Sequence, residues 1–414
     1  MTAAIRRGAL ALFLVTSAAT WAVAADPSPV GLWDATIVVG TNKFVVPFKF
    51  EISGAGRDVT GFFFDGDQKV PSTEGHYENG ALTLVYPQFG ARLEATWDGD
   101  RLVGKYDRGT RGVVYPFAAA RARPTPASTA AVPSIAGEWR IALPKDSEKG
   151  ETSWRLVIRQ TAQQVTAAIM RVDGDSGALT GPFRNGTFFL SHFPGTGPTT
   201  LEITPAPDGS LRLVEDGANK LTAVRVNDAR AKAIAEPTDP HTYTSVKNPS
   251  EKFRFRFPDV DGKIVADTDA RFQGKVVIVS VTGTWCPNCH DEAPFLAGLY
   301  RSHRARGLEI VALSFEEPEQ LKDLTRVRGF IMQYGIAYPF LIAGQPEEAP
   351  DKIPQAVNLN TFPATFVLGR DGRVRAVHAG YASKATGDFY TKEQQQFVAE
   401  IDRLLAEKAP AASR

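Results

Sequence analysis

The sequence predicts a multidomain chain in which two repeated antiparallel all-β units, each a small barrel or sandwich, precede a C-terminal α/β domain. Three observations support this prediction. The chain has 414 residues, enough for roughly two to four domains. A pattern of residues near the start occurs again 106 positions later. From about Ser245 onward, strand-like segments alternate with helix-like segments, which is typical of a sheet covered by helices.

Composition excludes several classes of protein. Hydrophobic residues make up 43% and charged residues 22%, which is ordinary for a globular chain and excludes wholesale disorder and fibrous repeats. The formal net charge of +1 gives no electrostatic reason to expect nucleic acid or an anionic membrane as a partner. The only two cysteines, Cys286 and Cys289, lie three positions apart, so a scaffold stapled by several disulfides is excluded.

Residues 1–24 are typical of a secretory signal peptide. Two arginines provide the positive start, residues 9–15 form a short apolar core, and residues 22–24 are small, as a cleavage site requires. We expect the mature chain to begin at Ala25.

An uncleaved membrane anchor is the alternative, but residues 8–25 include Thr16, Ser17 and Thr20, which weaken this segment as a span. No later segment is long and apolar enough to cross a bilayer, so no membrane span is expected after cleavage. The sequence thus predicts a soluble protein of an oxidising extracytoplasmic compartment. The alanine-rich signal is typical of bacteria, so the compartment would be the periplasm.

The β units are predicted at residues 26–123 and 135–230, with a linker rich in Pro, Ala, Ser and Thr at 124–134. Trp33 matches Trp139 within a repeated Gly-x-Trp, and Asn79-Gly80 matches Asn185-Gly186, a pair that suits a two-residue hairpin turn. The Gly-x-Trp opening resembles the first strand of lipocalin-like barrels.

The histidines of the β units, His76 and His192, have no metal-ligand spacing, and we interpret them as ordinary residues. The units carry no catalytic constellation. Partner binding, protection of the C-terminal domain and spacing from a membrane all remain open as their role.

The C-terminal domain is predicted at residues 245–410. Apolar runs indicate buried strands at 275–281, 308–313, 338–342 and 364–368. Helices are expected from the cysteine pair through Arg306, over a segment that stops at Gly335, and at the C-terminal end. There, Thr391 and Gln394 form a possible capping box ahead of an apolar face.

The pair Cys286 and Cys289 predicts disulfide-exchange chemistry. Cys286 stands where a strand turns into a helix, and the unpaired N–H groups and the helix dipole there favour a thiolate. Pro287 occupies the first helical position, where its missing N–H costs nothing. Cys289 follows almost one turn later, close enough to attack a mixed disulfide at Cys286. We therefore expect Cys286 to be the more exposed and more acidic thiol.

Four segments carry a resemblance to the TlpA/ResA branch of the thioredoxin superfamily: residues 257–263, 274–277, 285–289 and 292–294. The resemblance covers about 160 residues and leaves the β units unexplained. It implies a thioredoxin-like fold with an extra strand–helix insertion. It also implies a thiol–disulfide oxidoreductase that uses the redox-active Cys286–Cys289 disulfide and no other cofactor.

The resemblance also implies further site residues. Glu292, three positions after the second cysteine, is expected to exchange protons with the Cys289 thiol, its neighbour on the helix. Pro363 is expected to be the cis-proline opposite the cysteines. With Phe362 and Trp285 it would form the substrate-binding surface. Ordinary thioredoxins carry a buried aspartate where this chain has Ser280.

We expect this branch to act as a periplasmic reductase. Its partners would be disulfide-containing periplasmic proteins, as clients, and an electron-donor thiol protein that restores the dithiol. A thiol peroxidase is one alternative, although Gly283 stands where such enzymes normally carry threonine. A binding module built from the β repeats, with a subordinate redox domain, is another.

Two further chemistries share the same residues. Cys286, Cys289 and His290 match the c-type haem attachment motif, but the β-branched strand upstream and Trp285 favour the redox interpretation. A copper or zinc site would combine these ligands with His378, but ligands so close in sequence are strained for tetrahedral coordination. We expect His290 to be a solvent-facing helix residue, and we expect no bound metal.

Overall fold

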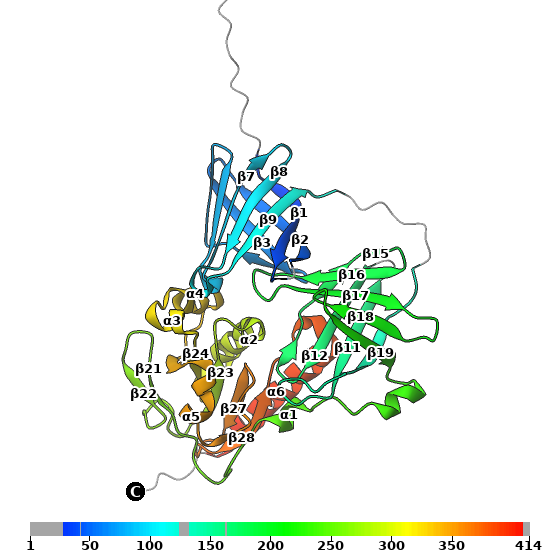
Figure 1. Cartoon of the computed structure of the whole chain (residues 1–414). Helices are drawn as coiled ribbons and strands as arrows, with labels where there is room; N and C mark the ends of the chain where they lie inside the picture. Colours follow the sequence, from blue (N-terminus) through cyan, green and yellow to red (C-terminus); the bar gives the residue numbers. More distant parts are fainter. Residues whose placement is uncertain (1–27, 42, 124–131, 162–163, 409–414) are drawn as a thin grey trace, which may run out of the picture.

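The computed structural model describes residues 28–41, 43–123, 132–161 and 164–408 (Figure 1). The predicted signal peptide and most of the predicted linker lie outside the described residues. Two β units and an α/β domain are arranged around the helix that follows the cysteine pair (Figure 1). We call them the first barrel, the second barrel and the redox domain. None of the described helices is long and apolar enough to cross a membrane.

The first barrel is a nine-stranded antiparallel sheet that the pairing of β2 with β3 closes on itself. Apolar side chains alternate along its strands and fill the interior, as the period of two requires. Its strands are β1 Gly31–Val39, β2 Phe44–Ala55, β3 Asp58–Asp65, β4 Gln68–Pro71, β5 Glu74–Glu78, β6 Ala81–Tyr86, β7 Ala91–Asp98, β8 Arg101–Asp107 and β9 Val114–Arg121. Two 3-10 helices, η1 Pro87–Phe89 and η2 Gly109–Arg111, lie in its loops.

The second barrel repeats this strand order and is closed by the pairing of β11 with β12. Its strands are β10 Gly137–Ala142, β11 Ser153–Thr161, β12 Gln164–Arg171, β13 Gly174–Asp175, β14 Leu179–Gly181, β15 Phe183–Arg184, β16 Thr187–His192, β17 Thr199–Pro205, β18 Leu211–Glu215 and β19 Asn219–Arg225. The sequence left a barrel or a sandwich open, and both units are closed, barrel-like sheets.

Equivalent interactions occur at the start of each barrel. The indole N–H of Trp33 donates to the Pro29 carbonyl at 2.9 Å, and that of Trp139 donates to the Ile135 carbonyl at 2.9 Å. An arginine from the last strand covers each ring, Arg121 at 4.1 Å and Arg225 at 4.3 Å from the ring centroid. Each tryptophan therefore ties the start of its barrel to the end.

The predicted hairpin turns are also present in both copies. Asn79 and Asn185 both have φ of 50°, and the glycines after them have φ of 77° and 85°. Positive φ at both central residues is what a type I′ turn requires, and asparagine followed by glycine adopts it at the lowest cost.

The barrels are locked together by a loop of the second barrel. Phe193 lies in the hydrophobic core of the first barrel, where its ring is 5.0 Å from Phe48 and 5.5 Å from Tyr106. The Tyr106 hydroxyl donates to the Gly195 carbonyl at 2.8 Å, and Arg108 donates to Thr196 at 3.2 Å. Loop 193–197 therefore closes one end of the first barrel.

The redox domain contains a five-stranded sheet in the order β25-β24-β23-β27-β28. β23 is central, pairs in parallel with β24 and is antiparallel to β27. The strands of this sheet are β23 Val276–Thr282, β24 Leu308–Phe315, β25 Phe340–Gly344, β27 Ala364–Leu368 and β28 Val374–Ala379. Short pairs also form between β20 Ser245–Val246 and β26 Ala356–Val357, and between β21 Arg256–Pro258 and β22 Ile264–Ala266.

The alternation of strands and helices predicts helices on both sides of this sheet. Long helices cover one face, and a short helix that contains Ala349 packs into the core on the other. Val276 and Ile278 pack with residues of α2, α4 and α6, whereas Val277, Val279 and Val281 point to the opposite core. The helices of the domain and the segment before it are α1 Pro240–Tyr243, α2 Pro287–His303, α3 Pro318–Lys322, α4 Thr325–Tyr334, α5 Ala349–Lys352 and α6 Asp388–Ala406. Four further 3-10 helices are η3 Ala229–Ala233, η4 Arg304–Arg306, η5 Pro346–Glu348 and η6 Lys384–Thr386.

The four predicted strands of the redox domain are present, with ends that differ by up to two residues, and a helix follows Cys286. The helix that ends at Gly335 was expected to include Leu321, but the extended backbone at Asp323 divides it into α3 and α4.

The last helix is present, but its predicted start was wrong. α6 begins at Asp388 with Gly387 at its N-cap, so Thr391 and Gln394 lie inside the helix. The capping-box prediction was wrong because η6 ends at Gly387, where the chain can already turn into the helix.

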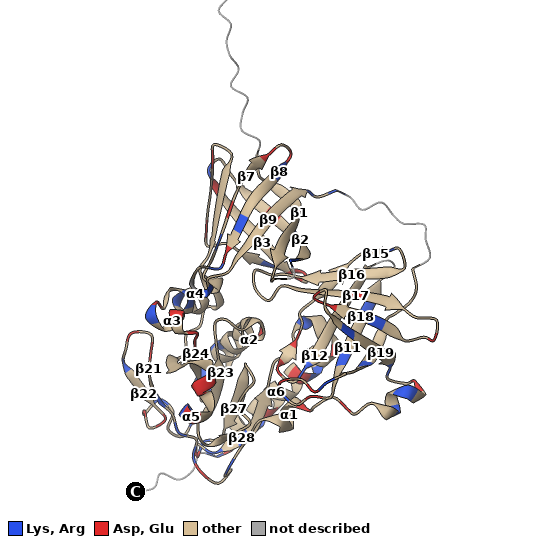
Figure 2. Ribbon diagram, viewed as in Figure 1, with Lys and Arg blue, Asp and Glu red and all other residues tan. Residues whose placement is uncertain are grey.

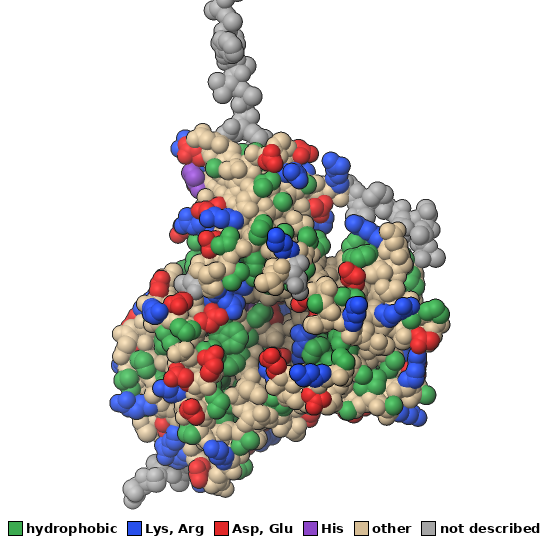
Figure 3. All heavy atoms as spheres, in the orientation of Figure 1, with side chains coloured by type: hydrophobic (Ala, Val, Ile, Leu, Met, Phe, Trp, Pro, Cys, Tyr) green, Lys and Arg blue, Asp and Glu red, His purple; other side chains and the backbone are tan. Residues whose placement is uncertain are grey.

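The charge distribution agrees with the near-zero net charge. Lysine and arginine alternate with aspartate and glutamate over all three units (Figure 2). The molecular surface is hollowed where the three units meet (Figure 3).

Gly329 of α4 packs directly on the first barrel and provides a test of this arrangement. A Cβ atom at Gly329 would lie 2.6 Å from the Pro87 backbone carbon and 2.8 Å from the Gln88 nitrogen, whereas one at Gly298 of α2 would have no neighbour closer than 3.9 Å. Alanine in a helix interior is favoured over glycine by about 0.5–1 kcal/mol. We expect Gly298→Ala to raise the melting temperature and Gly329→Ala to lower it. Equal shifts in the same direction, measured by calorimetry, would contradict the contact between α4 and η1.

Candidate active site

The site is built where β23 ends and α2 begins. Cys286 is the N-cap of α2, and its sulfur accepts the Cys289 backbone N–H at 3.3 Å. Pro287 occupies the first helical position, as predicted. The Cys286 thiol donates to the Phe362 carbonyl at 3.2 Å. The two cysteines are free thiols that lie next to each other at one helix terminus.

Both thiols are buried, with exposed fractions of 4% for Cys286 and 1% for Cys289. Cys286 is the more exposed of the two, as expected, but the difference is small because both thiols are buried. The sequence did not show that Cys286, with Cys289, Phe315 and Phe362, belongs to one hydrophobic cluster. Burial raises the pKa of the Cys289 thiol well above its usual value, and the neighbouring Cys286 raises it further. Cys289 is thus protonated at neutral pH and needs a base before it can attack.

Glu292 lies beneath the cysteines rather than on the surface. Its carboxyl group accepts hydrogen bonds from Ser280 at 2.9 Å and from Thr365 at 2.6 Å. Burial raises the pKa of Glu292 to about 7, although both hydroxyl donors lower it. The carboxyl group is close enough to Cys289 for its charge to raise the pKa of that thiol. Ser280 stands where ordinary thioredoxins carry an aspartate. Its hydroxyl therefore orients the Glu292 carboxyl group.

The predicted substrate-binding residues lie beside Cys286. The peptide bond between Phe362 and Pro363 is cis, as expected from the sequence. The Phe362 ring is 5.2 Å from the Trp285 ring and 6.2 Å from the Phe315 ring. The tertiary structure therefore brings together all six predicted site residues, although they come from two separate segments, residues 285–292 and 362–363.

Comparisons with known proteins identify similar sequences and structures. A model of the AhpC/TSA family matches residues 249–377. The thiol–disulfide oxidoreductase ResA of Bacillus thuringiensis is 30% identical over 139 residues, which are 34% of this chain and 73% of that protein. The ResA protein of Bacillus subtilis is 28% identical over 136 residues, 33% of this chain and 69% of that protein. A solved thioredoxin-family thiol:disulfide interchange protein from Chlorobium tepidum is 24% identical, with a TM-score of 0.29, over 39% of this chain and 100% of that one.

The chain belongs to the ResA family of thiol–disulfide oxidoreductases. The family-model match, residues 249–377, lies within the redox domain, and the enzymatic activity that the relatives show is thiol–disulfide exchange.

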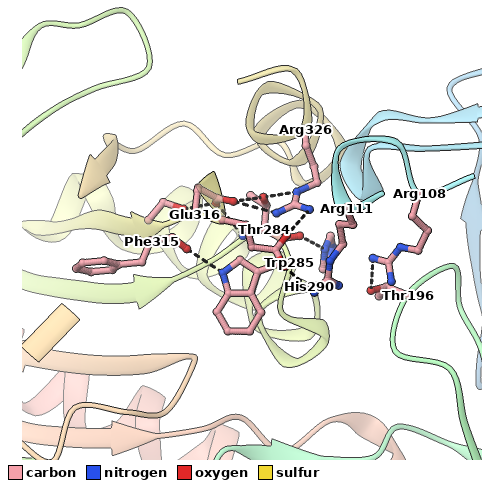
Figure 4. Close-up of polar contacts among 11 residues, drawn as sticks. Arg108, Arg111, Thr196, Thr284, Trp285, His290, Phe315, Glu316 and Arg326 are labelled. Atoms are coloured by element: carbon pink, nitrogen blue, oxygen red, sulfur yellow. Dashed lines mark hydrogen bonds and ion pairs between the residues drawn. The ribbon is translucent and has the colours of Figure 1, made fainter. Parts of the chain in front are cut away.

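A buried ion pair, which the sequence analysis missed, holds the loop before the ResA-family cysteines (Figure 4). Arg326 of α4 contacts Glu316 at 3.1 Å, and both side chains are inaccessible to water. The carboxylate of Glu316 accepts the Thr284 N–H at 2.9 Å and its hydroxyl at 2.7 Å. The Trp285 indole donates to the Phe315 carbonyl at 2.9 Å. The two residues that precede Cys286 are thus fixed in place.

A sequence signal for this pair exists. Glu316 directly follows the apolar strand β24, and Arg326 stands in a helix whose neighbouring residues are buried. A charge at the end of a buried strand is rarely left unpaired. Glu317, the next residue, pairs with Arg111 of the first barrel at 2.7 Å, so the same loop also holds that barrel.

His290 is buried, and the prediction that it faces solvent was wrong. Its Nε2 is 3.0 Å from the Thr284 carbonyl, so Nε2 carries the proton, and Nδ1 accepts from the Tyr334 hydroxyl at 2.8 Å. The Phe89 ring of the first barrel packs 4.9 Å from it. Burial lowers the pKa of His290 to about 3, so the ring is neutral and brings no charge to the cysteines.

The positions of His290 and His378 do not favour the copper or zinc site that was the alternative. Both ring nitrogens of His290 are already hydrogen-bonded, and His378 pairs instead with Glu400 and His241. Within the described ranges, no group of three or more His, Cys, Asp or Glu residues is arranged to hold a metal ion.

Both barrels contact the first turns of α2. Asn288 donates to the Asp173 carbonyl of the second barrel at 2.8 Å. Asp291 is hydrogen-bonded to Asp65 of the first barrel, and burial together with the charges of Asp65 and Asp175 raises the pKa of Asp291 well above its usual value. Two carboxyl groups in contact share a proton. The β units, which the sequence analysis left without a role, therefore form part of the active-site surroundings.

The carboxyl group of Glu292 should make stability depend on pH. Folding raises its pKa from 4.5 to about 7, so its ionisation costs folding free energy as pH rises through this window, by about 3 kcal/mol above pH 7. Glu292→Gln cannot ionise. Its melting temperature relative to the wild type should therefore increase between pH 5 and pH 8.

Glu309→Gln serves as the matched control, because Glu309 is also buried but lies next to Arg304. The melting temperature of this variant relative to the wild type should not increase between pH 5 and pH 8. A melting-temperature difference for Glu292→Gln that stays constant with pH would contradict the raised pKa.

Proposed function

We propose that the chain is a periplasmic reductase that passes electrons from the Cys286–Cys289 dithiol to disulfides in client proteins. The observation that carries the proposal is the placement of a buried carboxyl group, Glu292, beneath a resolving thiol that needs a base. Residues 1–24 support the compartment, because they have the features of a secretory signal.

The reaction begins at Cys286. Its thiol loses a proton to water, and the thiolate attacks one sulfur of a client disulfide. A mixed disulfide forms, and the first client thiolate leaves and takes a proton from water. Glu292 then accepts the proton of Cys289. The resulting thiolate attacks the Cys286 sulfur, the mixed disulfide breaks, and the second client thiolate leaves. The client gains two electrons, and the Cys286–Cys289 disulfide is left for an electron-donor thiol protein to reduce.

The client segment would bind at the surface formed by Trp285, Phe362 and Pro363. The Phe362 carbonyl accepts a hydrogen bond from the Cys286 thiol at 3.2 Å, so this part of the surface lies next to the nucleophile. The two aromatic rings pack edge to face beside it and would contact apolar client side chains. The proposed partners are therefore disulfide-containing periplasmic proteins with an exposed extended segment.

A thiol peroxidase is the second candidate function. It is favoured by the match to the AhpC/TSA family. Gly283 stands three positions before Cys286, where the sequence comparison above expects threonine, and the relatives are named as disulfide oxidoreductases. Consumption of hydrogen peroxide at a rate that exceeds disulfide reduction would decide for the peroxidase.

Trapping experiments test the order of the two cysteines. Cys289→Ser should accumulate mixed disulfides with client proteins, since the resolving thiol is gone. Cys286→Ser should accumulate few, since Cys289 is buried and protonated. The measurement is non-reducing electrophoresis of protein isolated after alkylation. Equal trapping by both variants would overturn the assignment.

The reduction potential tests the direction of electron flow. Strong oxidants stabilise their thiolates, whereas burial opposes the Cys289 thiolate here. We expect a potential below roughly −220 mV, measured by equilibration with glutathione buffers. A potential near about −120 mV, as in strong oxidants, would contradict a reductase.

A further inference from the structure

Glu292 is buried inside the redox domain, away from direct contact with bulk water. Its exposed fraction is 5%, and its carboxyl group is held by Ser280 and Thr365. In the reaction proposed above, it takes a proton from Cys289 in every turnover. That proton has to leave before the carboxyl group can act as a base again.

A small cavity adjoins Glu292, and neither cysteine lines it. Its volume is about 60 Å³, and Glu292, Thr365, His378 and His241 line it. A water molecule needs roughly 10–15 Å³ of such volume and two or more polar partners, so the cavity has room for several waters. The second barrel and α6 complete its wall through Arg171 and Phe397.

His378 stands between this cavity and the surface. It lies on β28 directly opposite Thr365 on β27, the residue whose hydroxyl binds Glu292. Its Nδ1 is 3.1 Å from Nδ1 of His241, and its Nε2 is 3.5 Å from the Glu400 carboxylate. The side chain of His378 is 21% exposed, and His241 is an exposed residue of α1, which packs beside β28 (Figure 1).

We infer that His378, together with His241, relays the proton between the buried Glu292 carboxyl group and bulk water through this cavity. Imidazole suits this task because it gains and loses a proton near neutral pH and has two nitrogens that face different partners. The inference rests on the proposed function, because it assigns Glu292 as the base for Cys289. It makes His378 and His241 positioning residues that act on the chemistry through Glu292.

The groups around His378 are suited to a relay rather than to a fixed ion pair. Charged or titratable side chains face it from α1, α2, α6 and the second barrel: His241, Glu292, Glu393, Glu400 and Arg171. The Glu400 carboxylate lies 3.5 Å from one ring nitrogen of His378, and the other ring nitrogen is 3.1 Å from a second imidazole. One of the two Nδ1 atoms must carry a hydrogen, because two unprotonated ring nitrogens cannot hydrogen-bond to each other. A proton is therefore already present between His378 and His241.

The step balances without any additional reactant. The Cys289 thiol gives its proton to the Glu292 carboxylate, and the thiolate breaks the mixed disulfide at Cys286. Glu292 then passes the proton through the cavity to His378 and His241 and on to water. Cys286 releases its proton to water before it attacks, and the two client thiolates together take two protons from water, so the cycle consumes and releases no net proton.

The test uses the full reduced chain and the chromogenic disulfide 5,5′-dithiobis(2-nitrobenzoate) in stopped flow, with EDTA present so that no metal occupies the histidine pair. The first phase is attack by Cys286, and the second is release of the second chromophore by Cys289. We expect His378→Ala to leave the first phase unchanged and to slow the second about tenfold at neutral pH. Added imidazole should restore the second phase in proportion to its concentration.

His303→Gln is the matched control. His303, like His378, is a partly buried histidine that faces a carboxylate of α6, here Asp402 at 3.4 Å, but it does not line the cavity. It should retain both phases. A second-phase rate in His378→Ala equal to that of His303→Gln would overturn the relay. So would a shifted pH midpoint that imidazole does not reverse, because it would show an electrostatic effect on Glu292.

Glu292→Gln distinguishes a failure of the relay from a failure of the proposed role of Glu292. If it slows the second phase while His378→Ala does not, the relay fails and the proposed role of Glu292 stands. If Glu292→Gln leaves the second phase unchanged, the proposed function of this carboxyl group fails, and the relay fails with it.

Discussion

The exclusion of water from the first turns of α2 is the constraint on which the rest of the site depends. The Cys289 thiol, the Glu292 carboxyl group and the His290 ring all lie there and are buried. Burial raises the pKa of the thiol and of the carboxyl group and lowers that of the imidazole, so it favours the uncharged form of each. A neutral thiol next to a carboxyl group that titrates near pH 7 is the arrangement that proton transfer between them requires.

Much of this exclusion is provided by the barrels. Phe89 packs on His290, Asp65 contacts Asp291, and Asp173 accepts from Asn288, so three successive sides of α2 are covered by segments from outside the redox domain. The insertion of Phe193 into the first barrel fixes the two barrels relative to each other. The β repeats are thus structural neighbours of the chemistry, and their contact with α2 determines which sides of the helix remain open to a client.

The ion pair of Glu316 and Arg326 shows how the loop before the cysteines is kept in one conformation. Removing two charges from water is costly, and attraction compensates for it only where the remaining hydrogen-bonding groups are also satisfied. Here Thr284 and Ser314 complete the bonds of the carboxylate. Any other path of the loop would leave a buried charge without partners. The main effect of the ion pair is therefore to position Thr284 and Trp285 beside Cys286, rather than to increase the free energy of unfolding.

The sequence by itself determined the local features: the repeat, the Asn-Gly turns, the strand-to-helix position of Cys286 and the cis bond at Pro363. Each depends on residues close together in the chain or on a motif shared with relatives. The burial of His290 and Cys286, the network around Glu316 and the cavity beside Glu292 were decided only by the tertiary structure. They depend on contacts between segments as distant as Phe89 and His290 or His241 and His378, and solvent exposure is a property of everything that packs around a side chain. A helix position predicted to face water becomes interior when another unit of the same chain covers it.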